Sequence, residues 1–127
     1  MASVISEHPP VLPSDDSLYE IVDGQIVEKN VGGFASWLAL RLLLSLQRHI
    51  DTHPVGTLAI ETVLVLDAAN GLHRRPDVAF FSAETWPLNG PPPLTGDWAV
   101  VRDLAVEVLS PNDLYQNVAR KLREYFH

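Results

Sequence analysis

The chain has 127 residues and a mass of 14.1 kDa, the size of one domain, which leaves little room for a second. Hydrophobic residues make up 46% of it and charged residues 20%, a globular composition that excludes disorder along the whole chain. Nine Lys and Arg residues against sixteen Asp and Glu residues give a net charge of −7, which argues against a protein that coats nucleic acid with a broad basic face. Any contact with nucleic acid must therefore be local.

The charge is distributed unevenly along the chain. Residues 1–73 carry a net charge of −6 and residues 74–127 a net charge of −1, so basic side chains are concentrated in the second part. The absence of cysteine excludes disulfides and thiolate metal sites, and the first 30 residues lack the basic start and apolar run of a secretory leader. The longest strongly apolar stretch, residues 37–46, is too short to cross a bilayer. We therefore expect a cytoplasmic protein without a membrane span.

The first half of the chain predicts a hairpin followed by a helix. Residues 1–17 hold three prolines beside Ser and Asp, so we expect a flexible lead-in before a folded domain over residues 18–127. Residues 18–22 and 25–28 flank Asp23-Gly24, the strongest short signal for a β-hairpin. Apolar residues then recur at three- and four-residue spacing and predict a helix from about residue 34 to about His49. Because apolar side chains lie on almost all its sides, we expect most of its surface to be covered.

The second half predicts strands and a final helix. Residues 57–66 and 74–81 are extended stretches on either side of a turn, which predicts a second antiparallel pair. The Pro- and Gly-rich stretch 86–97 is typical of a surface loop, and residues 99–109 predict another strand. Ser110-Pro111 predicts the start of the last helix, with Ser110 as the N-cap.

Two carboxylates, Asp77 and Glu107, interrupt otherwise apolar strands. By the alternation of a strand, each shares a face with apolar side chains, where an isolated charge would cost several kcal/mol. A shared Mg²⁺ or Mn²⁺ ion, which prefers oxygen ligands, would satisfy both. Two separate salt bridges, to Arg75 and Arg102, would satisfy them equally well. The spacing leaves both interpretations open.

The position of Lys121 favours a site in which Asp77 and Glu107 lie close together. It lies inside the apolar stripe of the last helix and therefore faces the sheet. Glu107 precedes the turn by about 10 Å of strand and Lys121 follows it by about 15 Å of helix, and the lysine side chain leans back toward the helix start. Asp77, Glu107 and Lys121 can therefore meet. The alternative is a lysine whose stem covers the edge of the core while its ammonium reaches water.

These motifs resemble the Uma-two family of restriction endonucleases, part of the PD-(D/E)XK nuclease superfamily. The resemblance rests on residues 74–80 (Arg-Arg-Pro-Asp-Val-Ala-Phe), residues 104–113 (Leu-Ala-Val-Glu-Val-Leu-Ser-Pro-Asn-Asp), Lys121 with Glu124-Tyr125, and an opening hairpin at residues 19–24. It covers residues 18–126 and implies an α/β (α+β) restriction-endonuclease-like fold, in which helices flank a mixed central sheet. The superfamily's usual lysine would fall at Leu109, and Lys121 resembles its relocated replacement.

The resemblance also implies a reaction, the metal-assisted hydrolysis of a phosphodiester bond in DNA. It makes Asp77, Glu107 and the carbonyl of Val108 the ligands of Mg²⁺ or Mn²⁺. Lys121 would orient the attacking water or offset the charge of the phosphate.

Several further charged residues stay open to two interpretations. Glu20 and Glu61 would each either add a third carboxylate or lie on a solvated strand face. Arginines of the second half would either line a phosphate-binding edge or be ordinary surface charge; they are Arg74, Arg75, Arg120 and Arg123. The five histidines lack ligand-like spacing, so a zinc site is not expected.

The chain departs from the family pattern at its C-terminal end. Family members continue past the lysine-bearing helix, whereas this sequence ends at His127, so we expect a domain that is incomplete at its C-terminus. An edge strand left uncovered would need a partner, and a homodimer is one remedy. Besides the endonuclease, two functions stay open: an inactive remnant that acts as a binding module, and a metal-dependent phosphoesterase with another substrate.

Overall fold

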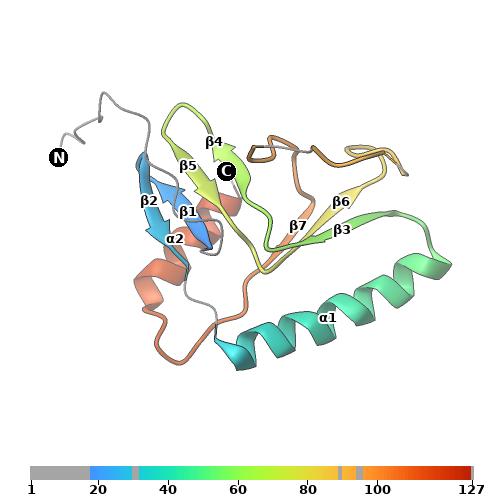
Figure 1. Cartoon of the computed structure of the whole chain (residues 1–127), viewed down its shortest axis with the longest axis horizontal. Helices are drawn as coiled ribbons and strands as arrows, with labels where there is room; N and C mark the ends of the chain where they lie inside the picture. Colours follow the sequence, from blue (N-terminus) through green and yellow to red (C-terminus); the bar gives the residue numbers. More distant parts are fainter. Residues whose placement is uncertain (1–17, 30–31, 89, 94–95, 127) are drawn as a thin grey trace.

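The computed structural model describes residues 18–29, 32–88, 90–93 and 96–126 (Figure 1). The predicted lead-in over residues 1–17 lies outside this part. The described elements are, in chain order, β1 (Tyr19–Val22), β2 (Gln25–Glu28), α1 (Gly33–Thr52), β3 (Gly56–Ile60), β4 (Leu64–Asp67), β5 (Leu72–Arg74), β6 (Val78–Ser82), β7 (Leu104–Val106) and α2 (Tyr115–Tyr125). The expected α/β class is confirmed.

The N-terminal hairpin is confirmed, with Ile21 opposite Ile26 in the β1–β2 pair. Asp23 and Gly24 have φ angles of 53° and 73°, the left-handed conformation that a two-residue hairpin turn requires. A second turn packs against the first, because the N–H of Gly24 donates to the carbonyl of Gly71 at 3.0 Å. A Cβ added to Gly71 would lie 2.8 Å from the Gly24 backbone, so the contact between the two turns requires glycine.

The strands form two sheets with the orders β2-β1-β5-β4 and β3-β6-β7. All neighbouring strands are antiparallel, and an isolated parallel bridge joins Leu64 of β4 to Trp98. The single mixed sheet that the resemblance implies is therefore wrong for the described residues, whose strands form two antiparallel sheets.

The chain crosses between the sheets at residues 61–63 and again at residues 75–77, and we call these two crossings the seam. The single strand predicted over residues 57–66 is wrong, because Glu61 adopts a φ of 46° and separates β3 from β4. The predicted antiparallel pairing is confirmed in two parts, β3 with β6 and β4 with β5. Arg75 fixes the seam, since its guanidinium donates to the carbonyls of Tyr19 at 3.0 Å and of Glu61 at 2.6 Å.

The core lies beside the seam and is partly aromatic. Leu64 and Phe81 are fully buried, and Phe81 meets Trp86 edge-on with ring centroids 5.2 Å apart. Trp86 in turn meets Trp98 at 5.1 Å. The stretch 86–97, predicted as a surface loop, therefore contributes the buried indole of Trp86 to the core. The indole N–H donates to the carbonyl of Gly90 at 3.0 Å. Residues 89, 94 and 95 of this stretch lie outside the described residues.

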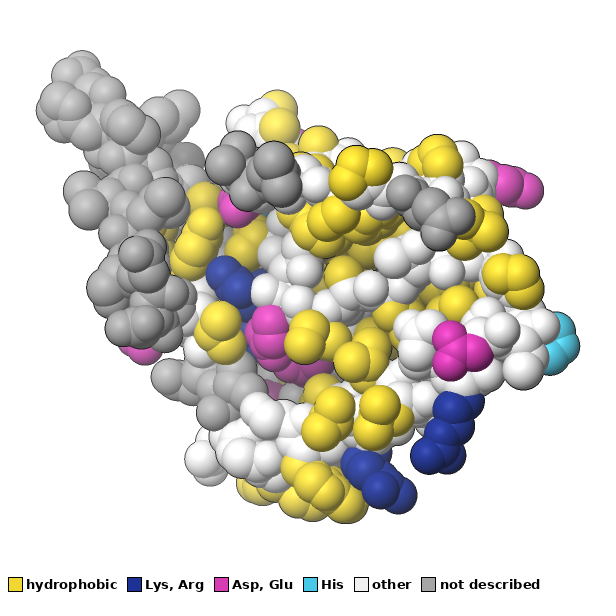
Figure 2. Space-filling model, turned by 45° about the vertical axis from the view of Figure 1, so that its right-hand side comes forward, with side chains coloured by type: hydrophobic (Ala, Val, Ile, Leu, Met, Phe, Trp, Pro, Cys, Tyr) yellow, Lys and Arg dark blue, Asp and Glu magenta, His cyan; other side chains and the backbone are white. Residues whose placement is uncertain are grey.

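Helix α1 runs along one side of the molecule and continues past its predicted end to Thr52 (Figure 1). The expectation that most of its surface is covered is wrong: its buried residues are Ala35 and Ala39, while Phe34 is 69% exposed. The two alanines begin a narrow contact stripe that continues in the half-buried Leu42, Leu46 and Ile50. Figure 2 shows hydrophobic side chains gathered along the lower edge of the molecule, where α1 lies. Within the described residues, no helix combines the length and apolarity needed to cross a membrane.

The last strand and helix are shorter than predicted. β7 spans Leu104–Val106, and α2 begins at Tyr115 rather than at Pro111. Ser110 is not the N-cap, because Leu114 holds that position; Ser110 instead closes a turn in which its N–H donates to the Asp113 carboxylate at 2.7 Å and its carbonyl accepts from the N–H of Asp113 at 3.1 Å. At its other end α2 is tied to the segment before β7, since Arg102 donates to the carbonyl of Tyr125.

Candidate active site

The seam brings together carboxylates from distant parts of the chain. Glu61 lies in the first crossing, Asp77 in the second, and Glu107 directly after β7. Helix α2 packs beside them and supplies Lys121, while Lys29 enters from the end of β2. The convergence expected of Asp77, Glu107 and Lys121 is therefore present in outline, with Lys29 and Glu61 as additional members.

Asp77 is buried, and both of its carboxylate oxygens have partners. Oδ1 lies 3.1 Å from Nζ of Lys29, and Oδ2 accepts a hydrogen bond from the backbone N–H of Val108 at 2.5 Å. The backbone of Val108, whose carbonyl the resemblance makes a metal ligand, thus lies against Asp77. The role of that carbonyl stays a prediction.

Lys29 is the residue that the sequence analysis missed. Its ammonium lies within 4 Å of three carboxylates, at 3.1 Å from Asp77, 3.7 Å from Glu61 and 3.8 Å from Glu107. It also donates to the carbonyl of Arg75 at 2.5 Å. Burial lowers the pKa of Lys29, but Glu107, Asp77 and Glu61 together raise it above its ordinary value, so the ammonium is held charged. One signal could have identified it, since Lys29 and Lys121 are the only lysines in the sequence.

The salt bridges considered as an alternative, from Asp77 and Glu107 to Arg75 and Arg102, are wrong. Arg75 donates to backbone carbonyls of the seam and Arg102 to the carbonyl of Tyr125. Lys29 serves both carboxylates instead, because β2 ends beside the second crossing. This pairing joins residues 48 apart in the sequence, which strand spacing alone does not reveal.

Glu107 lies between two lysines and a tyrosine. Its Oε2 is 3.8 Å from Lys29 and 3.7 Å from Lys121, and its Oε1 accepts a hydrogen bond from the hydroxyl of Tyr125 at 2.8 Å. Burial raises the pKa of the Glu107 carboxyl, although both lysines and the tyrosine oppose that shift. Burial, followed by the charge of Glu107, raises the pKa of Tyr125 above its ordinary value, so this hydroxyl stays protonated and remains a donor.

Neither Glu20 nor Glu61 lies on a solvated strand face. Glu20 is buried and binds Arg74 at 3.3 Å and Lys121 at 3.3 Å. Glu61 lies outside any strand, and its Oε2 is a buried oxygen without a hydrogen-bond partner, 3.7 Å from Lys29. Burial raises the pKa of Glu61 against the charge of Lys29, with a further contribution from Asp77. Glu61 is therefore the carboxylate best placed to join Asp77 and Glu107.

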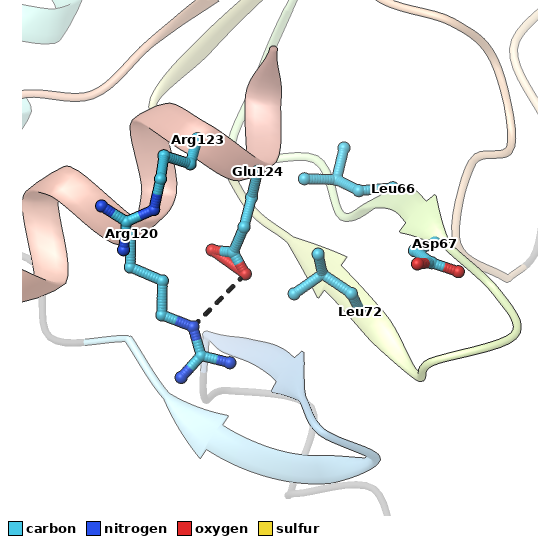
Figure 3. A pocket seen from close by; sticks show the side chains of 6 residues that line it. All are labelled: Leu66, Asp67, Leu72, Arg120, Arg123 and Glu124. Carbon is cyan, nitrogen blue, oxygen red and sulfur yellow. Dashed lines mark ion pairs between the residues drawn. The ribbon is translucent and has the colours of Figure 1, made fainter. Parts of the chain in front are cut away.

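The four candidate arginines fall into two groups. Arg74 is buried between Glu20 and Glu124, at 3.3 and 2.6 Å, and Arg75 is bound to the seam, so neither is free for a phosphate. Arg120 and Arg123 lie on α2 and line a cavity of about 460 Å³ (Figure 3). Leu66 and Leu72, from β4 and β5, form its apolar wall.

A second cavity, of about 430 Å³, opens over the charged cluster on the other side of Arg120. Lys29, Glu107 and Lys121 line it, whereas Asp77 does not. In the part of the chain that the structure describes, no group of three His, Asp or Glu side chains is arranged to hold a metal ion as it stands. The donors nevertheless fit Mg²⁺ or Mn²⁺ in kind, because three carboxylates surround one cation and one buried oxygen of Glu61 lacks a hydrogen bond.

Comparisons with known proteins give a family and a structural neighbour for this chain. A family model described as "Uma2: Putative restriction endonuclease" matches residues 7–127. The chain is also similar to a crystal structure described as "a putative nuclease belonging to DUF820" from Anabaena variabilis, with a TM-score of 0.71 and 19% sequence identity. That similarity covers 91% of this chain and 64% of the other, so this chain spans less than two thirds of that protein's length. No curated protein matches the chain.

Proposed function

The chain belongs to the Uma2 family, and from this premise we propose that it is a divalent-metal-dependent DNA endonuclease that hydrolyses phosphodiester bonds. The family and the fold of the structural neighbour indicate a nuclease. Metal dependence, the phosphodiester bond and DNA as the substrate are the finer parts of the proposal.

The observation that carries the proposal is the gathering of Asp77, Glu61 and Glu107 around one cation position, with Lys121 beside it. Asp77, Glu107 and the carbonyl of Val108 would hold Mg²⁺ or Mn²⁺, and Glu61 is near enough to contribute. A bound divalent ion supplies Lewis acidity toward the phosphate and lowers the pKa of a coordinated water. Three carboxylates in so small a space, two of them with raised pKa values, are typical of functional sites.

The chain's own residues supply the remaining chemistry. Lys121 is 26% exposed and lines the cavity, so its ammonium can offset phosphate charge and orient the attacking water. Tyr125 holds Glu107 by its 2.8 Å hydrogen bond. Arg120 lines both this cavity and the one in Figure 3, which makes it a candidate contact for the phosphate next to the scissile one.

A plasmid-nicking assay tests the proposal. Wild-type protein is expected to nick supercoiled DNA with Mg²⁺ or Mn²⁺ and to stop in EDTA. Asp77→Asn, which keeps the side chain's shape, is expected to abolish nicking, and Lys121→Met to slow it about 100-fold, the usual cost of one electrostatic donor. Arg48→Met, which removes an exposed charge from α1, is the control and is expected to keep activity. Equal nicking by wild type and Asp77→Asn would contradict the assignment.

A second function, a binding module without catalysis, is favoured by one observation. Lys29 already pairs with all three carboxylates and ties β2 to the seam, which gives the cluster a structural role that needs no metal. In that case Mn²⁺ would not bind in a manner that depends on Asp77 and Glu107, as titration calorimetry can determine.

A further inference from the structure

The position of Lys29 bears directly on how a metal could enter the site. Its Nζ lies within 4 Å of Asp77, Glu61 and Glu107 at once, and its side chain is 9% exposed. The carboxylates are therefore arranged around an ammonium, which is consistent with the lack, among the described residues, of any three acidic or histidine side chains already set to hold a metal.

Lys29 also lies between Asp77 and the solvent-accessible cavity. Lys29 and Glu107 line that cavity, while Asp77 is 4% exposed and does not. A divalent ion that approaches through the cavity meets the ammonium before it reaches Asp77.

The ammonium and a divalent ion compete for these oxygens in the arrangement described. Mg²⁺ binds carboxylate oxygens at about 2.1 Å. An ion at that distance from Oδ1 of Asp77 would lie at most about 5 Å from Nζ of Lys29, because Nζ is 3.1 Å from the same oxygen. Two cations so close in a poorly solvated space repel each other strongly.

We propose that Lys29 is a resident cation of the carboxylate cluster and that a divalent metal binds by displacing its ammonium. This inference rests on the proposed function, since it concerns the same site. The exchange explains how buried Asp77 and the half-buried Glu61 and Glu107 can lie together before metal arrives, and it means that the charge of Lys29 weakens metal binding. A Lys29→Met variant keeps a side chain of similar length without the charge and is the direct probe.

The experiment measures Mn²⁺ affinity by titration calorimetry for wild type, Lys29→Met, Lys29→Arg and Asp77→Asn, with Arg48→Met as the charge-matched control. Lys29→Met is expected to bind Mn²⁺ at least ten-fold more tightly than wild type. Lys29→Arg, which keeps the charge, and Arg48→Met are expected to stay within about three-fold of wild type. Equal or weaker binding by Lys29→Met would overturn the inference.

Melting temperatures in EDTA and in Mn²⁺ provide a second test in case Lys29→Met is destabilised. Lys29→Met is expected to melt below wild type in EDTA and to gain more from Mn²⁺, because metal replaces the lost cation. An equal or smaller gain, or a chain that stays unfolded in Mn²⁺, would overturn the inference. The Asp77→Asn arm separates the two proposals: binding that does not require Asp77 counts against the metal site and the nuclease, whereas Asp77-dependent binding unaffected by Lys29 counts against the exchange alone.

Discussion

Nζ of Lys29 lies 3.1 Å from Oδ1 of Asp77, and this contact joins the end of β2 to the crossing that leads into β6. Both groups are buried, and Lys29 is the cation that pairs with the charge of Asp77. In EDTA, Lys29→Met is expected to lower the free energy of unfolding by about 3 kcal/mol. The double variant Lys29→Met/Asp77→Asn is expected to be more stable than Lys29→Met alone, because it lacks the orphaned Asp77 charge. Urea unfolding of wild type, Lys29→Met, Asp77→Asn and the double variant measures the coupling between the two side chains, and strictly additive losses would argue against it.

Tyr125 is expected to affect stability and metal binding by holding Glu107 in place. Tyr125→Phe removes the 2.8 Å hydrogen bond to Oε1 and is expected to cost about 1.5 to 3 kcal/mol of stability, the range for a bond to a charged group. It is also expected to weaken Mn²⁺ binding about ten-fold, because partners that orient a metal ligand usually contribute at least that much. Calorimetry and urea unfolding measure the two effects. Tyr115→Phe, whose ring is 85% exposed at the start of α2, is the matched control, and equal behaviour of the two variants would refute this role.

Arg74 is expected to be structural rather than DNA-binding. It is buried between Glu20 and Glu124, so Arg74→Met removes one cation from each acid, leaving Glu20 with Lys121 and Glu124 with Arg120, and is expected to cost about 3 kcal/mol. Arg123→Met, on an exposed part of α2, is expected to change stability by no more than about 0.5 kcal/mol. Urea unfolding compares the two, and a loss for Arg74→Met as small as that for Arg123→Met would show that the buried network contributes little.

Tyr19 gives a prediction for alkaline pH. Burial, and then the neighbouring Asp97, raise the pKa of its phenol above the ordinary value of 10.0, and its hydroxyl donates to Asp97 at 3.2 Å. A group whose pKa is raised in the folded state stabilises the fold fully below its unfolded pKa, and that contribution is lost as pH rises through the folded pKa. The stability difference between wild type and Tyr19→Phe is therefore expected to be largest below pH 10 and to shrink above it. Urea unfolding from pH 8 to 11 measures this, and a difference that stays constant would contradict the sign.

The hairpin and the α/β class were predictable because they depend on local signals. Asp23-Gly24 favours the left-handed backbone of a two-residue hairpin turn, and the structure has it. Strand boundaries were less predictable. Residues 57–66 have a composition typical of one continuous strand, and only the φ of 46° at Glu61 divides them into β3 and β4. The start of α2 was missed because Ser110 and Asp113 bond each other in a turn, an alternative open to the same residues.

The candidate site was half predictable. Asp77 and Glu107 are conspicuous as charges in apolar strands, and Lys121 as a charge in an apolar helical stripe. Lys29 follows a partly exposed strand of ordinary polar composition, so no local pattern distinguishes it from a surface lysine. Its contact with Asp77 depends on how β2 meets the seam, which is a property of the tertiary fold. The roles assigned to these residues, the homodimer and the domain bounds stay predictions.

The seam described above also gives the carboxylates a mechanical setting. Glu61 and Asp77 each occupy a crossing of three residues between the sheets, so their separation follows the angle at which the sheets meet. Arg75 braces both crossings from within, and the Gly24–Gly71 contact holds two turns of the first sheet together. A substitution that shifts Arg75, or the Tyr19 and Glu61 carbonyls that it holds, is therefore expected to change the spacing of the carboxylates. Variants that tune activity without touching a ligand should be sought among residues that set the angle between the sheets.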